Sequence, residues 1–504
     1  MPAKRSLTLA LALLLVAAIP ARGATPPTMQ QIDLRPGADS SSPGELVSFA
    51  GKIFFSADDG THGHELWRTD GAPDATHAGT ELACDLFTAA GFGSNPYILA
   101  VLGDWLYFRA DPGIARRALY RTNGAIDGCE EVTTASVIEN MEYPRVVGDQ
   151  LWFSADFDDD VEPWMATSTG APAQVANINP TGSSNPAGFT KLGSYVYFNA
   201  DNGTDGYELW KSNGTGATMA ANINETPGQG SNPTELFSAA AFDLLLFKAY
   251  SPTAGWELFG TDGINLELLD INEGVESSDP GQFTEVNATV YFTAFTDETG
   301  IELWSLNQTD GFELVSDINP GTNSSSPQQL RAIGDWLYFT ATTAATGYEL
   351  WRTNGTTTEM VIDILPGTNG AYPFGFVEHD GVIFFSANNG SIWTLYQTTG
   401  TAASTVEAVT ATGTNPYVGC ECNTPIVFLG DRAFTYMGNT EYGYEVAFFD
   451  PLLPSTNRDG SGLPLMLIMG AALTAAASVS LRLRRVRHAR AGSTRVGGLS
   501  PLRD

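Results

Sequence analysis

Residues 65–71 read Glu-Leu-Trp-Arg-Thr-Asp-Gly, and residues 349–355 repeat this stretch with Asn in place of Asp. Weaker copies occur at Leu119-Tyr120, Glu162-Pro163-Trp164, Leu395-Tyr396 and Glu445-Val446. Self-similarity at a spacing of about 20 to 50 residues is the signature of a repeat fold. We therefore interpret the stretch as one strand of a unit that the chain uses many times.

The unit begins at a proline that closes a Ser-Asn-Pro-like turn. These prolines are Pro43, Pro96, Pro144, Pro186, Pro233, Pro280, Pro327, Pro373 and Pro416. After each proline come an apolar strand, a second strand with paired large residues such as Tyr338-Phe339, and the Glu-Leu-Trp strand. A fourth strand ends in a segment such as Asp317–Gly321. Four short antiparallel strands in about 40 to 50 residues are typical of one propeller blade.

The second strand needs burial on both of its faces, because consecutive residues in a strand point to opposite sides. A blade packed between two neighbours provides that burial. The sequence thus predicts an all-β fold, a single β-propeller with nine blades, or with eight if one blade is merged or degenerate. Residues 32–37 read as a fourth strand without earlier strands, and the ninth unit ends near Asp450 without its own fourth strand. We expect the N-terminal strand to complete the ninth blade and close the ring.

Six copies of the third strand end in Asp-Gly or Asn-Gly. The first residues of these pairs are Asp70, Asn123, Asn213, Asp262, Asp310 and Asn354. Such a pair favours a two-residue hairpin turn in which both central residues have positive φ. We predict this turn between the third and fourth strands.

Three segments, residues 65–71, 208–215 and 349–356, resemble the bacterial ELWxxDGT repeat family. The resemblance covers nearly all of residues 30–450. It implies an exported, propeller-like protein, often in a chain with a surface-sorting tail. It supplies no catalytic residues.

Both terminal regions lie outside the repeats. Residues 1–23 have the layout of a secretory signal peptide, with Lys4 and Arg5 before an apolar run. Residues 463–481 are 19 uncharged residues, which is long enough for a transmembrane helix. The sequence predicts a propeller of 42–53 residue repeats at 24–450, a linker at 451–462, this helix, and a basic cytoplasmic tail at 482–504.

The arginines of the tail predict the membrane orientation. Arg482, Arg484, Arg485 and Arg487 directly follow the apolar segment, and basic residues favour the cytoplasmic side. The propeller would then lie outside the membrane, at the cell envelope or cell surface. Asp459-Gly460-Ser461-Gly462 occupies the place of a short signature in bacterial sorting tails, so the helix is either retained as an anchor or processed.

The excess of acidic residues excludes some classes of binding partner. The chain has 57 acidic and 25 basic residues, and three of the basic residues lie in the leader and seven in the tail. A surface this acidic repels nucleic acid, because phosphate binding needs a basic face. We expect an extracellular protein or polysaccharide as partner, with membrane contact only through the C-terminal helix.

Acidic loops between the second and third strands are candidate Ca²⁺ sites. Their residues are Asp58, Asp59, Asp156, Asp158, Asp160, Asp201 and Asp205. Oxygen-rich loops with Gly at the bend can hold Ca²⁺, and the alternative is that these are solvated turn residues. His62 and His64 would share a strand face and could form a metal site with Asp58, Asp59 or His77, although packing is the better role for His64. No other cofactor is expected.

Catalytic motifs are scarce. A glutamate recurs in seven units, at positions 65, 162, 208, 257, 302, 349 and 445, and such regular use favours a structural hydrogen-bond acceptor over a catalytic acid. The sequence shows no convincing serine elbow, Walker loop, dinucleotide fingerprint or zincin motif. We interpret the chain as a non-catalytic binding or adhesion module. The alternative is an extracellular hydrolase or lyase acting on glycan or peptide, with a carboxylate pair from residues 156–162.

The chain has four cysteines, and export permits disulfides. Cys84 and Cys129 fall near the outer strands of the first two units, so we predict that they pair. Cys420 and Cys422 would be bonded locally or free.

Overall fold

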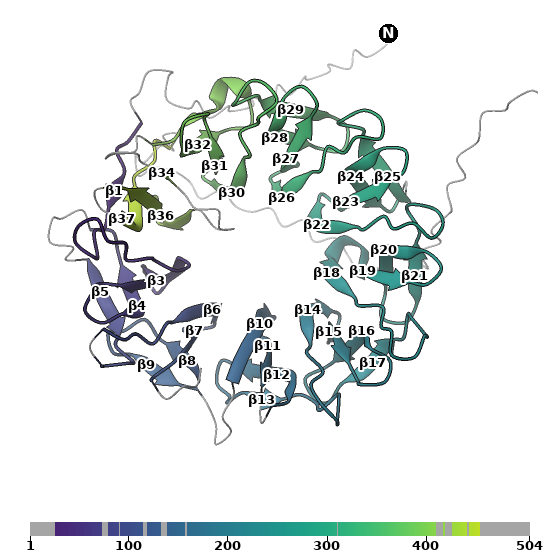
Figure 1. Cartoon of the computed structure of the whole chain (residues 1–504), viewed down its shortest axis with the longest axis horizontal. Coiled ribbons are helices and arrows are strands. Elements are labelled where there is room, and N and C mark those ends of the chain that lie inside the picture. Colours follow the sequence, from purple (N-terminus) through teal and green to yellow (C-terminus); the bar gives the residue numbers. More distant parts are fainter. Residues whose placement is uncertain are drawn as a thin grey trace, which may run out of the picture.

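The computed structural model describes residues 26–453, except 73–78, 90, 114–117, 133–138, 157–158, 310, 410–416, 419–425 and 441–442. In this part of the chain nine antiparallel sheets stand around a common axis as the blades of a propeller (Figure 1). The all-β prediction and the count of nine blades are confirmed, and the eight-bladed alternative is wrong. The predicted signal peptide, C-terminal helix and basic tail lie outside the described residues.

Blades 1 to 8 each contain four consecutive strands, and their order in the sheet is their order in the sequence. The first strand lies nearest the axis and the fourth on the outside (Figure 1). Blade 1 contains β2 (Val47–Phe49), β3 (Lys52–Asp58), β4 (His64–Thr69) and β5 (Thr80–Cys84). Blade 2 contains β6 (Tyr97–Leu102), β7 (Trp105–Ala110), β8 (Ala118–Thr122) and β9 (Cys129–Glu131). Blade 3 contains β10 (Glu139–Val147), β11 (Gln150–Asp156), β12 (Val161–Thr167) and β13 (Ala173–Gln174).

The next three blades repeat this order. Blade 4 contains β14 (Ala187–Leu192), β15 (Tyr195–Asp201), β16 (Tyr207–Ser212) and β17 (Thr218–Ala221). Blade 5 contains β18 (Thr234–Ala239), β19 (Leu244–Ser251), β20 (Gly255–Thr261) and β21 (Leu266–Leu269). Blade 6 contains β22 (Gly281–Val286), β23 (Thr289–Thr296), β24 (Gly300–Asn307) and β25 (Gly311–Ser316).

The last three blades complete the ring. Blade 7 contains β26 (Gln328–Ile333), β27 (Trp336–Thr343), β28 (Gly347–Thr353) and β29 (Thr358–Ile362). Blade 8 contains β30 (Phe374–His379), β31 (Val382–Asn388), β32 (Trp393–Thr398) and β33 (Val406–Glu407). Blade 9 contains β34 (Tyr417–Val418), β35 (Val427–Leu429), β36 (Arg432–Asn439), β37 (Gly443–Phe449) and, from the N-terminal side, β1 (Gln30–Gln31).

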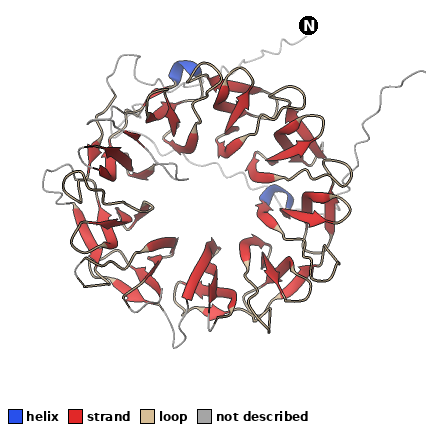
Figure 2. Ribbon diagram, in the orientation of Figure 1, coloured by secondary structure: helices blue, strands red, loops and turns tan. Residues whose placement is uncertain are grey.

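Helices are limited to two short 3₁₀ turns among the described residues, η1 (Ala240–Phe242) and η2 (Ala402–Ser404) (Figure 2). No described helix has the length and apolar character needed to cross a bilayer.

The N-terminal strand closes the ring as predicted. In β1, Gln30 pairs with Phe448 and Gln31 with Ala447 on the outer edge of β37. The chain then enters blade 1, so blade 9 contains strands from both ends of the propeller. This arrangement covers the β37 edge, which would otherwise present unpaired backbone groups.

The core lies between the blades, as the paired large residues predict. Phe54 and Leu66 pack in one cluster with blade 2, whereas Phe55 and Trp67 pack in another with blade 9. Both phenylalanines are fully buried. Each blade thus buries its two faces against different neighbours, and the ring has no single centre of hydrophobic packing.

The predicted turn between the third and fourth strands is wrong. In blade 7, Thr353 pairs with Thr358, so the loop has four residues, and only Gly355 of its Asn-Gly pair has positive φ. The Asn354 side chain instead accepts hydrogen bonds from the backbone N–H groups of Thr356 and Thr357. These bonds satisfy backbone N–H groups of the loop, so Asn354 does not need the left-handed backbone conformation.

Two-residue turns occur instead between the first and second strands. Asn287 and Ala288 both have positive φ between the paired residues Val286 and Thr289. We call this side of the ring the hairpin end. The opposite side, where the second strand of each blade leads into the third, is the loop end.

Candidate functional site

The recurring glutamate is a buried clamp between blades. Glu208 accepts hydrogen bonds from the backbone N–H groups of Ile223, Asn224 and Ser231 at 2.9–3.1 Å and from the Ser231 hydroxyl at 2.6 Å. Ile223 and Asn224 follow the last strand of blade 4, and Ser231 begins the turn into blade 5. The carboxylate thus fixes the connection from one blade to the next.

All seven glutamates are fully buried. Burial raises the pKa of Glu257, Glu349 and Glu445 to about 7, although hydrogen bonds to each carboxylate act in the opposite direction. Burial also raises the pKa of Glu65, Glu162 and Glu302. Their hydrogen bonds agree with the structural role predicted from the repeat. These carboxylates cannot reach a ligand outside the fold.

The clamp is absent in blades 2 and 8. Ala118 and Thr394 occupy the position that Glu65 has in blade 1, opposite an alanine of the second strand. After blade 2, the turn reads Glu142-Tyr143-Pro144 instead of Ser-Asn-Pro. Without a clamping glutamate, a serine at this turn has no partner to bind. The repeat therefore changes where the chain enters blade 3.

A pocket of about 640 Å³ lies at this change, on the loop end across blades 3 to 5. Most of its lining residues have a polar group in the side chain, and they come from all three blades. The lining residues are Glu142, Tyr143, Ser154, Val161, Asn185, Ala187, Asn199, Tyr207, Asn232 and Thr234. Tyr143 is 58% exposed, and its backbone has a positive φ of 51°.

Asn199, one of the lining residues, is held by two hydrogen bonds. Its Oδ1 accepts a hydrogen bond from the Ala187 N–H at 2.8 Å, and its Nδ2 donates to the Pro233 carbonyl at 3.0 Å. The amide joins blade 4 to blade 5 and keeps the pocket wall in place. The arrangement offers tyrosine faces, amides and hydroxyls to a ligand, with one exposed carboxylate at Glu142.

The equivalent space between blades 1 and 2 is smaller, about 370 Å³. Arg109 occupies the position of Asn199, donates to the Met141 carbonyl at 2.7 Å and lies 4.7 Å from the centre of the Tyr97 ring. The Arg109 guanidinium therefore covers one face of the Tyr97 ring. The larger pocket therefore has the more accessible aromatic surface.

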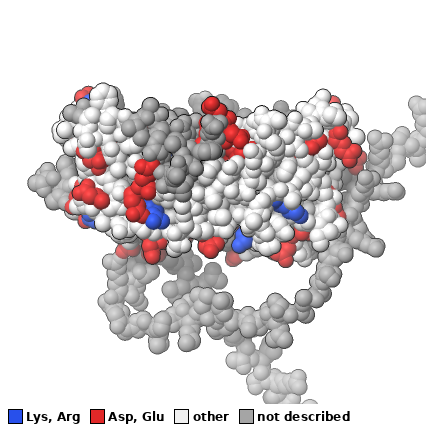
Figure 3. Space-filling model, turned by 90° about the horizontal axis from the view of Figure 1, so that it is seen from below, with Lys and Arg blue, Asp and Glu red and all other residues white. Residues whose placement is uncertain are grey.

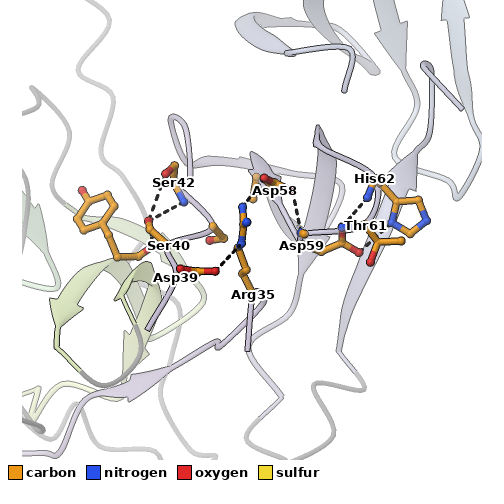
Figure 4. Close-up of polar contacts among 12 residues, drawn as sticks. Arg35, Asp39, Ser40, Ser42, Asp58, Asp59, Thr61 and His62 are labelled. Carbon is orange, nitrogen blue, oxygen red and sulfur yellow. Dashed lines mark hydrogen bonds and ion pairs between the residues drawn. The ribbon is translucent and has the colours of Figure 1, made fainter. Parts of the chain in front are cut away.

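Asp58 and Asp59 are turn-forming residues in the structure (Figure 4). Asp58 accepts hydrogen bonds from Arg35 at 2.6 Å and from the Gly60 N–H at 2.7 Å. Asp59 accepts from the N–H groups of Thr61 and His62 and contacts the His62 ring at 2.8 Å. Burial favours protonated Asp59, but these hydrogen bonds outweigh it and lower its pKa.

Among the described residues, His62 and His64 do not form the predicted metal site. His62 lies in the loop and His64 begins β4, so the two do not share a strand face as expected. His64 lines the smaller pocket, and His77 lies outside the described residues. The hydrogen bond that His62 donates to the Asp59 carboxylate raises the pKa of His62.

Asp201 and Asp205 form a similar loop in blade 4. Asp201 accepts a hydrogen bond from the Gly203 N–H at 2.7 Å, and Asp205 accepts one from the Asn202 amide at 2.8 Å. These bonds are those of solvated turn residues, the alternative that the sequence left open. Calcium binding at these loops stays a prediction.

Asp156 and Asp160 flank the corresponding loop of blade 3, and Asp158 lies outside the described residues. Burial raises the pKa of Asp160, and the negative charge of Asp156 raises it further. Asp160 also accepts a 3.4 Å hydrogen bond from Asn177. The two carboxyl groups thus influence each other, whereas nearby Glu162 serves as a blade clamp.

The predicted disulfide is present. Cys84 at the end of β5 is bonded to Cys129 at the start of β9, with a Cα–Cα distance of 6.2 Å. The bond links the outer strands of blades 1 and 2. Cys420 and Cys422 lie outside the described residues.

Sequence reasoning missed Tyr143, Asn199 and His379 as site candidates. Most units have Ser, Asn or Asp directly before the turn proline, whereas Tyr143 precedes Pro144. This difference was visible in the sequence. Asn199 gave no such signal, because small polar residues are common at its position. His379, described below, replaces a residue that is apolar in every other blade.

No protein-family model matches the sequence, and no curated protein matches it. Comparison with solved structures gives 484 matching chains. One, from a study of two prolyl endopeptidases, has 9% identity and a TM-score of 0.39, covering 71% of this chain and 56% of that one. Puromycin hydrolase has 13% identity and a TM-score of 0.35, covering 72% and 61%. The propeller domain of the Trilobed protease from Pyrococcus furiosus has 10% identity and a TM-score of 0.34, covering 62% and 98%.

These similarities concern the fold alone. The chain spans 56% and 61% of the length of the first two structures, and all three TM-scores are below 0.5. They carry no argument about activity or substrate.

Proposed function

We propose that this chain is an exported β-propeller, membrane-anchored or surface-sorted, that acts as a non-catalytic binding module for extracellular polysaccharide. The pocket across blades 3 to 5 carries the proposal. It occupies the place where the repeat changes, and its lining is suited to recognition. The ELWxxDGT-like repeats and the predicted leader and C-terminal helix support export, and the Cys84–Cys129 disulfide is typical of an oxidising compartment.

The chemistry of the pocket fits an uncharged sugar chain. Asn and Ser side chains can both donate to and accept from sugar hydroxyls, and the exposed Tyr143 ring offers an apolar face for a sugar ring. Glu142 and the acidic surface oppose binding of an anionic polymer. Figure 3 shows Asp and Glu side chains scattered over one side of the ring, with fewer Lys and Arg side chains among them.

The position of the pocket suits a long ligand. It lies on the loop end and is open to solvent, so a polymer can pass over it without threading through the fold. Its walls are strands of three adjacent blades, which makes the site rigid before the ligand arrives. Such preorganisation reduces the entropy lost on binding.

The test is retention of the full-length chain on immobilised neutral polysaccharides, compared with anionic ones. Tyr143→Ala should weaken retention by about tenfold, since exposed aromatic anchors typically contribute more than 1 kcal/mol. Tyr97→Ala is the control, because Tyr97 is an exposed tyrosine of the smaller pocket whose ring stacks on Arg109. Equal loss in both variants, or retention only on a protein partner, would contradict the proposal.

The second candidate function is hydrolysis or lysis of an extracellular glycan or peptide. Its support is the raised pKa of Asp160, to which the charge of Asp156 contributes, because two neighbouring carboxyl groups are the usual machinery of glycoside hydrolysis. Under this proposal Asp160→Asn abolishes turnover while leaving retention unchanged. Under the binding proposal no product forms with either protein.

A further inference from the structure

A second cluster of polar side chains lies on the hairpin end, far from the loops that carry the acidic turns. It consists of His379, Asp380 and Asp431, and one ligand atom of each lies within 4.8 Å of the others. His379 is the last residue of β30, and Asp380 is in the two-residue turn that follows. Asp431 is in the turn between β35 and β36. The cluster therefore joins blade 8 to blade 9.

His379 breaks the repeat at this position. In each blade the residue directly before the turn pairs with the first residue after it, and in the other eight blades that residue is apolar. The equivalents are Phe49, Leu102, Val147, Leu192, Ala239, Val286, Ile333 and Leu429. A polar residue used once among nine equivalent positions is not required by the blade architecture.

The imidazole is oriented by packing. Its ring stacks on Phe428 with the ring centres 3.9 Å apart and the planes at 5°. The Nε2 atom is buried, has no hydrogen-bond partner among the described residues, and lies 3.9 Å from Asp431 Oδ1. A buried nitrogen without a hydrogen bond is unfavourable, and a bound water, ligand or ion would satisfy it.

We propose that His379, Asp380 and Asp431 bind a divalent transition-metal ion, with Zn²⁺ the best match. One imidazole nitrogen and two carboxylate oxygens are a donor set that Zn²⁺ accepts, with water in the fourth position. In a tetrahedral site, zinc bonds of about 2.0–2.2 Å place two ligand atoms about 3.3–3.6 Å apart, so the cluster has to contract by about 1 Å. Both aspartates are exposed, and rotation of their side chains provides that movement.

The site has two structural consequences. The ion bridges the turns of two neighbouring blades next to the closure of the ring, so binding stabilises the folded state. Its outer side faces solvent, because the Asp431 side chain is 49% exposed. The fourth position is therefore accessible to water or to a donor atom of a ligand.

A simple ion pair is the alternative. A protonated His379 could pair with Asp431 without a metal, and the 3.9 Å separation falls within the range of such a pair. An ion pair does not bind zinc stoichiometrically, and it gives no cobalt absorption spectrum. Metal titration therefore separates the two explanations.

The experiment uses the full-length chain, purified without a histidine tag and stripped with a chelator. Calorimetry with Zn²⁺ measures stoichiometry and affinity, and Co²⁺ absorption between about 500 and 700 nm reports tetrahedral coordination. We expect one Zn²⁺ per chain at this site, together with a rise in the unfolding temperature.

Three variants remove ligands: His379→Leu, Asp380→Asn and Asp431→Asn. His379→Leu introduces the residue type found at Leu429, and Asn at 380 tolerates the positive φ of 51°. Each should weaken this site at least about tenfold. Asp104→Asn is the matched control, because Asp104 lies in the equivalent turn of blade 2, where Leu102 replaces the histidine.

The proposal is supported if each of the three variants binds one Zn²⁺ fewer per chain and the control variant binds as many as the unmodified chain. The proposal is overturned if the unmodified chain binds no Zn²⁺ at about 100 µM, or if His379→Leu leaves the stoichiometry, affinity and cobalt spectrum unchanged. If His379→Leu fails to fold, the two surface aspartate variants decide the question.

Discussion

At the scale of single residues, the repeat pairs a buried glutamate with the serine of the turn that leads into the next blade. Glu257 accepts from the Ser278 N–H at 2.6 Å and from the Ser278 hydroxyl at 2.5 Å, and Asp279 follows with a positive φ of 47° before Pro280. Asn and Asp tolerate that conformation better than most residues do. The Ser-Asn-Pro motif is therefore explained by the clamp and by the backbone of the turn.

We predict that Glu257→Gln lowers the free energy of unfolding by about 1–3 kcal/mol. A glutamine amide can accept through only one of its two terminal atoms, so one of the N–H or O–H donors loses its partner. Urea unfolding measures the change. Glu267→Gln, an exposed substitution in the same blade, should have almost no effect, and an equal loss in both variants would contradict the clamp.

The clamps also predict a pH dependence. The pKa of Glu257, Glu349 and Glu445 is raised from an ordinary 4.5 to about 7, so the folded state binds protons more tightly than the unfolded state. Their contribution is fully present below about pH 4.5 and is lost as the pH rises through 7. We expect the free energy of unfolding to be larger near pH 5 than near pH 8. Equal stability at both values, or greater stability near pH 8, would be inconsistent with these shifts.

At the scale of the element, the strands could be predicted from the sequence and the turns could not. Paired large residues such as Phe54 and Phe55 locate each second strand, because both faces must be buried. Asp-Gly and Asn-Gly predicted the wrong turn, since side chains such as Asn354 bond to the loop backbone instead. Turn geometry depends on such local competition, which residue type alone does not determine.

The disulfide is a contact between elements that can be removed cleanly. Replacing Cys84 and Cys129 with serine should lower the free energy of unfolding by about 2–4 kcal/mol, because the bond restricts the unfolded chain. Chemical denaturation with and without reductant measures the effect. The double variant should respond to reductant less than the wild-type protein does, and equal responses would show that this bond contributes little.

At the scale of the molecule, ring closure was predictable and the candidate sites were not. The N-terminal fourth strand and the missing strand of blade 9 complement each other in the sequence. By contrast, the pocket across blades 3 to 5 and the cluster at His379 arise where different blades meet. Their residues are distant in the sequence, and the spacing of the repeat gives no information about side chains that depart from it.

Closure should control the stability of the whole ring. Deleting residues 24–34 removes β1 and leaves the β37 edge unpaired, so we expect a lower unfolding temperature and concentration-dependent association. Calorimetry and light scattering measure these effects. Ser41→Ala is a smaller change at the same closure. Ser41 donates to Glu445 through its N–H and its hydroxyl, and the variant removes only the hydroxyl bond. An unchanged unfolding temperature in the deletion would contradict the assigned role of β1.

The central claim is that the loop end recognises a sugar chain without altering it. The most direct measurement is calorimetric titration of the full-length chain with neutral oligosaccharides, followed by mass spectrometry of the same samples after prolonged incubation. The account predicts saturable heat that Tyr143→Ala removes, with every oligosaccharide recovered intact. Accumulation of shorter fragments that Asp160→Asn prevents would contradict it and identify the propeller as an enzyme.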